Sequence, residues 1–211
     1  MKILIFAAAA VTAYLVAGWN PAITFSKGIY KKDIRECGSG NPGFTNLRRT
    51  FGNKWAWCVL LLDILKSAAV VAFWAEVMDA RWSCYELGAS FTAFFALLGH
   101  AFPLWYRFRG GKGFLVCLSG VWVMDWRAGL MATLLMVIIL LTARYMSLAT
   151  VVSLLCCPPL LALMGASLPS LIFCEASVLF VAVRHKENFK RLVKGTEPKF
   201  NIKPDKRRGA G

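Results

Sequence analysis

The sequence predicts an all-α integral membrane protein with about seven transmembrane helices in a single domain, residues 1–211. Three observations predict this class. Hydrophobic residues make up 58% of the 211 residues, and the mean hydropathy is +0.56, which is rare for a soluble domain. The apolar residues form long blocks that neither alternate with period two nor follow a narrow helical stripe. Many of the eight tryptophans lie near the block ends, where a membrane surface favours them.

The predicted spans follow from the lengths of these blocks, because about 20 residues cross roughly 30 Å of hydrocarbon. The first block begins like a signal peptide but continues through Val16 without a convincing cleavage site, so we interpret it as a membrane helix. The fourth and fifth blocks are short, which leaves open a five-helix arrangement with that stretch re-entrant. The predicted spans are 3–25, 54–75, 84–104, 113–124, 128–143, 147–165 and 168–183.

The distribution of positive charge predicts the orientation. The chain has 25 Lys and Arg against 11 Asp and Glu, a net charge of +14. With so much apolar sequence, this excess favours anionic lipid or acidic substrates over nucleic acid. Twenty-one of the 25 cationic residues fall on one side of the seven-span arrangement, three on the other, and Lys66 within a span. Because cytoplasmic loops carry the excess, we expect the N-terminus outside and the basic tail, 199–211, in the cytoplasm.

The cysteines predict neither a metal site nor a disulfide framework. All seven lack a C-x-x-C partner or a histidine at ligand spacing, so we interpret them as small apolar residues in a reduced compartment. We therefore expect no metal and no cofactor.

Two ionisable residues in the second predicted span call for an explanation, since a charge at mid-bilayer costs about 2.5–3.5 kcal/mol. Asp63 and Lys66 are three residues apart on one helix face, where they can neutralise each other. They form either a structural pair or a device that positions an anionic substrate. Glu175, in the last span, has no evident partner on its own helix, and we assign it no task.

The first cytoplasmic motif is a glycine-rich segment at 38–50. It formally matches G-x-G-x-x-G, but no predicted strand precedes it, so a dinucleotide-binding fold is not favoured. Its glycines still expose backbone N–H groups, and Thr45 and Asn46 are suited to open a helix, whose N-terminus attracts anions.

The second motif is a Gly-Gly-Lys-Gly turn at 110–113, ten residues after His100. It is not a P-loop, because Tyr106 and Gly113 stand where that motif needs Gly and Ser or Thr. A glycine turn at a helix start suits a phosphate group, with Lys112 as the point charge and the backbone as the cradle. Taken alone, the turn is equally a flexible basic loop, and His100 is more often structural than catalytic.

The third motif is a basic interfacial helix with a glycine stop, within 185–197. His185 and Asn188 are three residues apart, so both can point at one reacting group. Arg144 and Ser147 lie at the same predicted interface.

Together these motifs resemble those of the bacterial acyl-phosphate:glycerol-3-phosphate acyltransferase family, PlsY, over about residues 5–198. The resemblance is carried, in order, by Gly-Ser-Gly-Asn-x-Gly-x-Thr-Asn, by Gly-His-x-Phe-Pro with Phe-x-Gly-Gly-Lys-Gly, and by His-x-Glu-Asn-x-x-Arg-Leu-x-x-Gly-Thr-Glu. It implies transfer of a fatty acyl group from acyl phosphate to the sn-1 hydroxyl of glycerol 3-phosphate, giving lysophosphatidic acid and phosphate. It also implies seven helices in the bacterial plasma membrane, with the motifs facing the cytoplasm.

The chain departs from the family pattern at a few positions. Phe114, Leu115 and Val116 replace smaller residues, Ser67 replaces a usual glycine, and Phe44 replaces a common alanine. We expect the bulky residues to reshape the acyl groove, while the polar groups needed for chemistry are retained.

The motifs and the resemblance nominate fourteen site residues. The base is either His185, oriented by Glu197, or a phosphate oxygen of the substrate, which we favour; an acyl-Ser39 intermediate is an alternative without a visible Ser-His-Asp arrangement. The catalytic candidates are His185, Asn188, Ser39 and Glu197. The phosphate-binding candidates are Arg49, Lys112, Gly111, Ser147, Asn46, Thr45, Asn41 and His100. The positioning candidates are Lys66 and Arg144.

The rival class is a membrane transporter of organic phosphate anions. It predicts inverted repeats and binding residues near mid-membrane, whereas the candidates here lie at one face and no repeat is visible. Neither the acyl-chain length nor the oligomeric state follows from the sequence.

Overall fold

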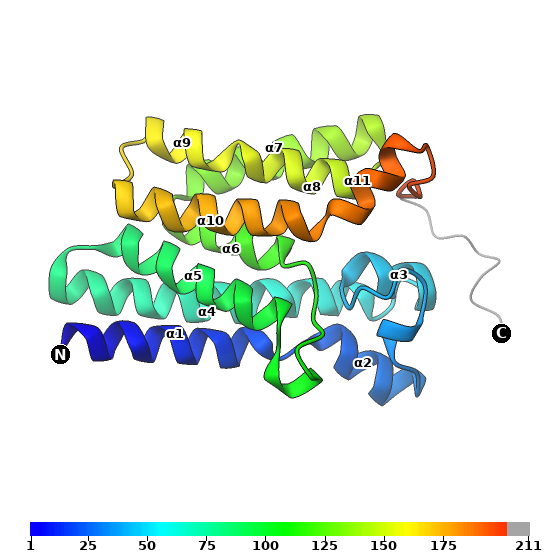
Figure 1. Cartoon of the computed structure of the whole chain (residues 1–211), viewed down its shortest axis with the longest axis horizontal. Coiled ribbons are helices and arrows are strands. Elements are labelled where there is room, and N and C mark those ends of the chain that lie inside the picture. Colours follow the sequence, from blue (N-terminus) through cyan, green and yellow to red (C-terminus); the bar gives the residue numbers. More distant parts are fainter. Residues whose placement is uncertain (202–211) are drawn as a thin grey trace.

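The computed structural model describes residues 1–201, and within them it contains helices and short 3₁₀ turns but no strand. The helices of the bundle run back and forth along one axis (Figure 1). They are α1 (Lys2–Gly18), α4 (Ala56–Trp82), α5 (Tyr85–Ala101), α6 (Phe114–Met124), α7 (Trp126–Ala143), α8 (Met146–Leu155), α9 (Cys157–Leu163) and α10 (Leu168–Arg184). The end away from the N-terminus carries the short helices α2 (Pro21–Tyr30), α3 (Phe44–Phe51) and α11 (Lys186–Val193). The 3₁₀ turns are η1 (Ile34–Glu36) and η2 (Leu104–Tyr106).

The described residues confirm the all-helical membrane class. Five helical segments are long and apolar enough to cross a bilayer, and a sixth is added if α10 and α11, which meet at a 53° bend, count as one span. Helix α6 has 11 residues, fewer than the ~20 that a straight span needs. The number of seven spans, the orientation of the termini and the single-domain assignment remain predictions. The basic end at 203–208 lies outside the described residues.

The first predicted span, 3–25, lies within one candidate membrane span, Lys2–Tyr30, but this span is not a continuous α-helix. It breaks between α1 and α2 at Trp19 and Asn20, because Pro21 has no N–H to continue the hydrogen-bond ladder. The Asn20 side chain caps α2 by accepting from the N–H of Ile23 (3.0 Å), and it donates to the carbonyl of Pro42 (3.1 Å). The break therefore directs α2 toward the glycine-rich loop.

The second predicted span, 54–75, is too short. Helix α4 continues to Trp82 through Glu76, Asp79 and Arg81, polar residues near its end that hid the continuation. The predicted span 128–143 starts two residues late, because α7 begins at Trp126. The predicted span 84–104 extends too far, because α5 ends at Ala101, shortly before Pro103. The predicted span 147–165 appears as α8 and α9, interrupted next to Pro158 and Pro159.

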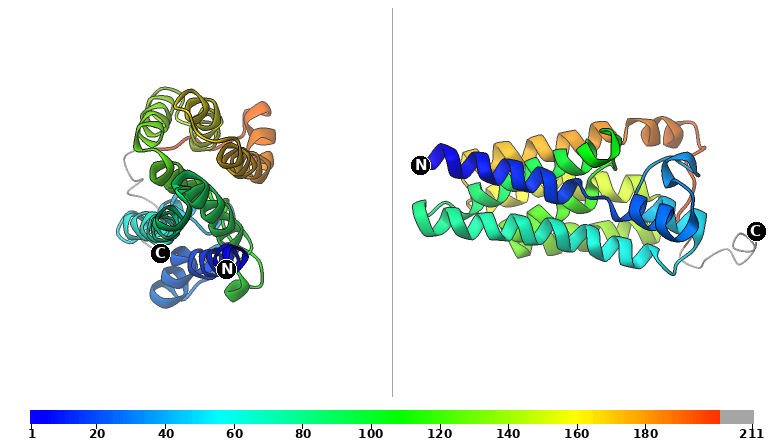
Figure 2. Two further views of the ribbon diagram at one scale, coloured as in Figure 1. Left: turned by 90° about the vertical axis from the view of Figure 1, so that its left-hand side faces the viewer. Right: turned by 90° about the horizontal axis from the view of Figure 1, so that it is seen from below.

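Helix α5 lies at the centre of the bundle, where it packs against α1, α4, α6 and α10 (Figure 2). Close packing against α1 depends on Gly99, because a Cβ atom there would lie 2.1 Å from the backbone oxygen of Tyr14. Small buried residues such as Ala13, Ala17 and Ala96 permit the same close approach elsewhere in this core.

We expect Gly99→Ala to lower the stability of the bundle by about 1–3 kcal/mol, because two backbones must separate to admit the methyl group. Thermal unfolding in detergent measures the effect. Gly28→Ala is the matched control, since nothing lies within 4 Å of a Cβ added there and alanine in a helix gains ~0.5–1 kcal/mol over glycine. Equal unfolding temperatures for the two variants would contradict the packing argument.

Candidate active site

One cavity of about 520 Å³ lies at the end of the bundle that carries α3 and α11 (Figure 1). It is enclosed by the glycine-rich loop, α3, the turn before α6, the start of α8, and the segment from His185 to Pro198. Residues separated by more than 150 positions in sequence therefore share one wall. Eleven of the fourteen nominated residues line it: Ser39, Asn41, Thr45, Asn46, Arg49, His100, Lys112, Ser147, His185, Asn188 and Glu197.

The glycine-rich loop is held by Asn46, which is 2% exposed. Its amide oxygen accepts from the N–H of Ser39 (2.9 Å), and its amide nitrogen donates to the carbonyl of Cys37 (2.9 Å). Gly38 has φ +57°, and a Cβ atom there would lie 2.3 Å from the same amide oxygen, so only glycine fits. Asn46 was nominated as a phosphate ligand; the structure instead commits its amide to the loop backbone.

The Gly-Gly-Lys-Gly turn packs directly against His100. The N–H of Gly111 donates to the carbonyl of His100 (3.2 Å), and a Cβ atom on Gly111 would lie 2.2 Å from the histidine Nε2. On the other side, Arg184 donates from Nη2 to the carbonyl of Gly111 (3.0 Å). The N–H of Gly111 is therefore bonded within the protein, and the nomination of Gly111 as a phosphate ligand remains a prediction. The turn acts by fixing Lys112.

The central feature of the cavity is a polar network around Glu197. One carboxylate oxygen accepts from Ser147 Oγ (2.8 Å) and Asn188 Nδ2 (2.7 Å), and the other accepts from Arg191 Nε (2.8 Å). The amide oxygen of Asn188 in turn accepts from Lys112 Nζ. Asn188 therefore orients Lys112, and side chains from α8 and α11 meet at one carboxylate.

The cavity is electropositive. Its cationic lining residues are Arg49, Lys112 and Arg191, and its only acidic lining residues among those described are Glu197 and Asp63. The hydrogen bonds from Asn188, Ser147 and Arg191 hold the pKa of Glu197 below its ordinary value, although burial alone would raise it. Asp63 is paired with Lys66, which does not line the cavity, and the three cations outnumber the two acidic groups among the described lining residues.

Burial lowers the pKa of Lys112 to about 8; Glu197 opposes this shift, while Arg191 and Arg184 add to it. Lys112 is therefore charged below this pH and loses its proton as the pH rises through it. We expect the dissociation constant for inorganic phosphate to increase from about pH 8 upward in a calorimetric titration between pH 7.5 and 9.5. Lys112→Arg is the control, because a guanidinium stays charged throughout this range. A flat profile for the unmodified protein would contradict this assignment.

His185 is buried, 5% exposed, at the junction of α10 and α11. Its Nδ1 lies 2.8 Å from the backbone carbonyl of Val181. A carbonyl only accepts hydrogen bonds, so the neutral ring carries its proton on Nδ1 and keeps Nε2 as an acceptor. The structure thus gives the orienting role to Val181, and the suggestion that Glu197 orients His185 is wrong.

A buried charged cluster lies behind the cavity wall. Lys66 Nζ pairs with Asp63 Oδ1 at 2.8 Å, as the spacing predicted, and it also donates to the carbonyl of Trp19 at the α1–α2 break. The same Nζ lies 3.4 Å from Nδ1 of His100. Lys66 does not line the cavity; it connects the helix break to the histidine that supports the glycine turn.

Arg144, the other positioning candidate, is not among the cavity-lining residues either. It ends α7 in the left-handed conformation (φ 62°), and its carbonyl accepts from the N–H of Phe200 (2.6 Å). Its contribution near the site is therefore made by its backbone.

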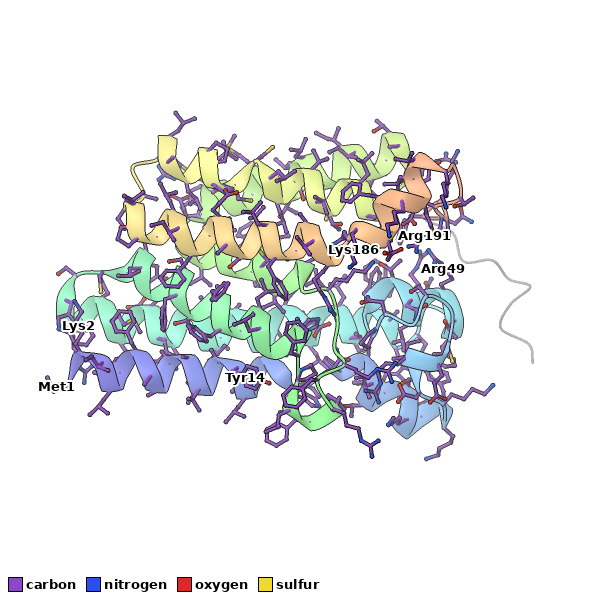
Figure 3. The ribbon with its side chains drawn as sticks, viewed as in Figure 1. Met1, Lys2, Tyr14, Arg49, Lys186 and Arg191 are labelled. Atoms are coloured by element: carbon purple, nitrogen blue, oxygen red, sulfur yellow. The ribbon has the colours of Figure 1, made fainter. Side chains whose placement is uncertain are left out.

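Two arginines at the site were not among the nominated residues. Arg191 on α11 and Arg49 on α3 both line the cavity, and Figure 3 shows both at the same end of the bundle. Arg184 holds the glycine turn and lies 5.3 Å from the ring centre of Phe102. The only sequence signal for Arg184 is its position directly after the last predicted span, next to His185. Within residues 1–201, no group of three or more His, Cys, Asp or Glu side chains could hold a metal ion.

The fold is an all-helical membrane bundle, and its basic cavity lies at one end of the helices. These features define a multi-pass membrane protein that holds anionic groups at that end. The family model for glycerol-3-phosphate acyltransferase matches residues 7–195. The chain therefore belongs to the glycerol-3-phosphate acyltransferase family, and it is an acyltransferase of phospholipid synthesis. This membership decides for the enzyme over the transporter.

Individual relatives agree over nearly the whole chain. The chain is 35% identical to glycerol-3-phosphate acyltransferase 2 of Thermotoga maritima over 190 residues, 90% of this chain and 89% of the relative. It is 37% identical to the Agrobacterium fabrum glycerol-3-phosphate acyltransferase over 203 residues, 94% of each.

Two crystal structures of PlsY, an integral membrane glycerol 3-phosphate acyltransferase, have the same fold. The glycerol 3-phosphate form superimposes with a TM-score of 0.81 at 30% identity, covering 93% of this chain and 96% of that one. The lysophosphatidic acid form gives a TM-score of 0.82 at 28% identity, covering 93% and 95%.

Proposed function

We propose that this protein transfers a fatty acyl group from acyl phosphate to the sn-1 hydroxyl of glycerol 3-phosphate, giving lysophosphatidic acid and inorganic phosphate. The observation that carries the proposal is a single cavity that combines three cations with an apolar wall. Support comes from the relatives, since PlsY structures are known in glycerol 3-phosphate and lysophosphatidic acid forms. The acyl phosphate donor is chosen on the chemistry below.

The polar half of the cavity suits two phosphate groups held close together. Lys112, Arg49 and Arg191 supply charge to offset their mutual repulsion. Helices α3 and α6 both begin at the cavity, and neither first turn has a side-chain cap, so their unpaired N–H groups can add to anion binding. Ser39, Asn41 and Thr45 add neutral polar groups, and Ser147 and Asn188 reach the same space.

The apolar half suits the acyl chain. Leu60, Phe114, Leu115 and Met136 line the cavity on the side that continues into the bundle. Phe44, another departure from the family pattern, is 8% exposed and also lines it. These bulky residues reduce the width of the groove, so we expect them to influence which acyl chains fit.

The reaction needs positioning more than acid–base power, because acyl phosphate is a mixed anhydride with a good leaving group. The glycerol O1 attacks the acyl carbonyl carbon, a C–O ester bond forms, and the C–O bond to phosphate breaks. His185 Nε2 accepts the hydrogen bond of the attacking hydroxyl and orients it, and the proton passes to an oxygen of the departing phosphate. Lys112, held by Asn188, stabilises the charge that grows on that phosphate.

A covalent acyl-Ser39 intermediate is not favoured by the geometry. The Ser39 backbone N–H is bonded to Asn46, but its hydroxyl makes no hydrogen bond to a basic side chain among the described residues. A serine nucleophile needs an adjacent base to become reactive.

We propose further that the cavity opens to the cytoplasm of a bacterial plasma membrane. The predicted orientation places 21 of the 25 Lys and Arg residues in four segments on one side of the membrane. These segments include Arg49, Lys112 and Arg191, which line the cavity. A reporter enzyme that is active only in the cytoplasm, fused after residue 211, tests this; an inactive reporter in a functional fusion would refute it.

Donor selectivity tests the proposed reaction. The purified protein is given glycerol 3-phosphate with palmitoyl phosphate, palmitoyl-CoA or palmitoyl-acyl-carrier protein, and lysophosphatidic acid is measured by mass spectrometry. We expect product with palmitoyl phosphate alone, because only in this donor is the leaving group a phosphate bonded directly to the acyl carbonyl, where Lys112 can stabilise it. Equal rates with palmitoyl-CoA would contradict the donor assignment.

A further inference from the structure

The segment after α11 folds back across the end of the bundle and ties α3 to α8. After Gly195 (φ +68°), the N–H groups of Thr196 and Glu197 donate to the carbonyl of Arg191 (2.8 and 3.2 Å). The chain then continues away from α11, and Phe200 donates its N–H to the carbonyl of Arg144 at the α7–α8 corner (2.6 Å). We call residues 198–201 the C-terminal clasp.

The far end of the clasp is held by Arg48 on α3. The Arg48 guanidinium lies 4.6 Å from the ring centre of Phe200, and its Nη1 donates to the carbonyl of Asn201 (2.7 Å). Its Nε donates to Asn53 Oδ1 just beyond the end of α3 (2.7 Å). One arginine thus joins the clasp to α3 through a cation–π contact and a charge-assisted hydrogen bond.

The Phe200 ring also takes part in apolar packing. It packs against the buried cluster that includes Ile34, Phe44 and Leu47, together with Met146 at the start of α8. Both Phe44 and Met146 line the cavity. Phe200 therefore belongs to the same apolar cluster as these two cavity-lining residues.

Helix α3 needs such support. It has eight residues, too few to be stable alone, and it carries Thr45 and Arg49 into the cavity. Arg48 and Arg49 are adjacent, so they project from different sides of the helix. Arg49 lines the cavity, at the same end of the bundle as Arg191 (Figure 3), while Arg48 binds the clasp. At its other end the clasp follows Glu197, the centre of the Ser147–Asn188–Arg191 network.

We infer that Phe200 is a positioning residue, which fixes α3 at the distance from α8 and α11 that lets Arg49 and Arg191 bind substrate phosphate together. This inference rests on the proposed function and extends it to a residue outside the cavity. The residues that hold Lys112 and His185, namely Asn188, Arg184 and Val181, lie outside the clasp, so loss of the Phe200 ring affects binding more than the chemical step.

The test compares Phe200→Ala with Phe200→Tyr, which keeps the ring face. We expect Phe200→Ala to weaken glycerol 3-phosphate binding about tenfold in calorimetry and to raise KM by a similar factor, with kcat changed less than about threefold. Phe200→Tyr should restore both values. A lower unfolding temperature for Phe200→Ala with an unchanged dissociation constant would overturn the inference, because it would show a purely structural role.

A double-variant cycle with Arg48→Gln tests the partner. Phe200→Ala should cost less in the Arg48→Gln background than in the unmodified protein, since the cation–π contact is already absent there; fully additive losses would overturn the assignment. Titration of inorganic phosphate in parallel separates the two claims. If the unmodified protein binds phosphate but transfers no acyl group, the proposed reaction fails, while the effect of Phe200→Ala on the phosphate affinity still tests the clasp.

Discussion

Replacing Lys112 by alanine is expected to lower kcat/KM for acyl transfer about 10²- to 10³-fold, the loss typical when one preorganised donor to a developing negative charge is removed. Lys112 is the cation that Asn188 and the His100-supported glycine turn hold in place, and it lies between Arg191 and the start of α6. Steady-state rates of lysophosphatidic acid formation measure the effect.

Lys112→Arg is the matched control for this prediction. Arginine keeps the charge but its planar fork does not reproduce the contact of a compact ammonium with Asn188, so we expect partial activity between alanine and lysine. Full activity in Lys112→Ala would show that this ammonium does not stabilise the leaving phosphate.

Replacing His185 by alanine is expected to lower kcat about 10²-fold, because the attacking hydroxyl loses the acceptor that orients it. His185→Gln should retain activity within about tenfold of the unmodified protein. Glutamine can still offer an acceptor oxygen, and its amide N–H can still donate to the carbonyl of Val181.

The glutamine variant separates the two candidate bases. If a substrate phosphate takes the proton, an acceptor that cannot be protonated at neutral pH suffices at position 185. If His185→Gln is as inactive as His185→Ala, the imidazole itself is the base, and the substrate-assisted pathway proposed here is wrong. Binding of glycerol 3-phosphate, measured by calorimetry, shows that each variant retains a formed site.

The fold was predictable where the apolar blocks are uninterrupted. Helices α6 and α10 differ from the predicted spans by one residue at most, because local composition marks their ends: Gly113 precedes α6 and the charged Arg184 ends α10. The break at Asn20 was not predicted, because the apolar block continues past Pro21, whose missing N–H ends the hydrogen-bond ladder. The end of α4 was predicted too early, because Glu76 and Asp79 make its last turns more polar than the rest of the apolar block.

The site residues were predictable from motifs, but their partners were not. The sequence places His185 and Asn188 on one helix face, yet it cannot show that Asn188 meets Lys112, 76 positions earlier. A glycine in a turn can either expose its N–H to a ligand or allow a neighbouring side chain to pack closely, and the sequence does not distinguish these roles. The structure shows close packing of Gly111 against His100. Val181 was within reach of sequence reasoning, since it precedes His185 by one helical turn.

The most direct test of the central claim is phosphate release from palmitoyl phosphate by the purified protein, measured with and without glycerol 3-phosphate. We predict release that requires the acceptor, matches lysophosphatidic acid formation mole for mole, and collapses in Lys112→Ala and His185→Ala. Release at the same rate without the acceptor, or binding of glycerol 3-phosphate with no release at all, would contradict the claim that this cavity joins an acyl group to glycerol 3-phosphate.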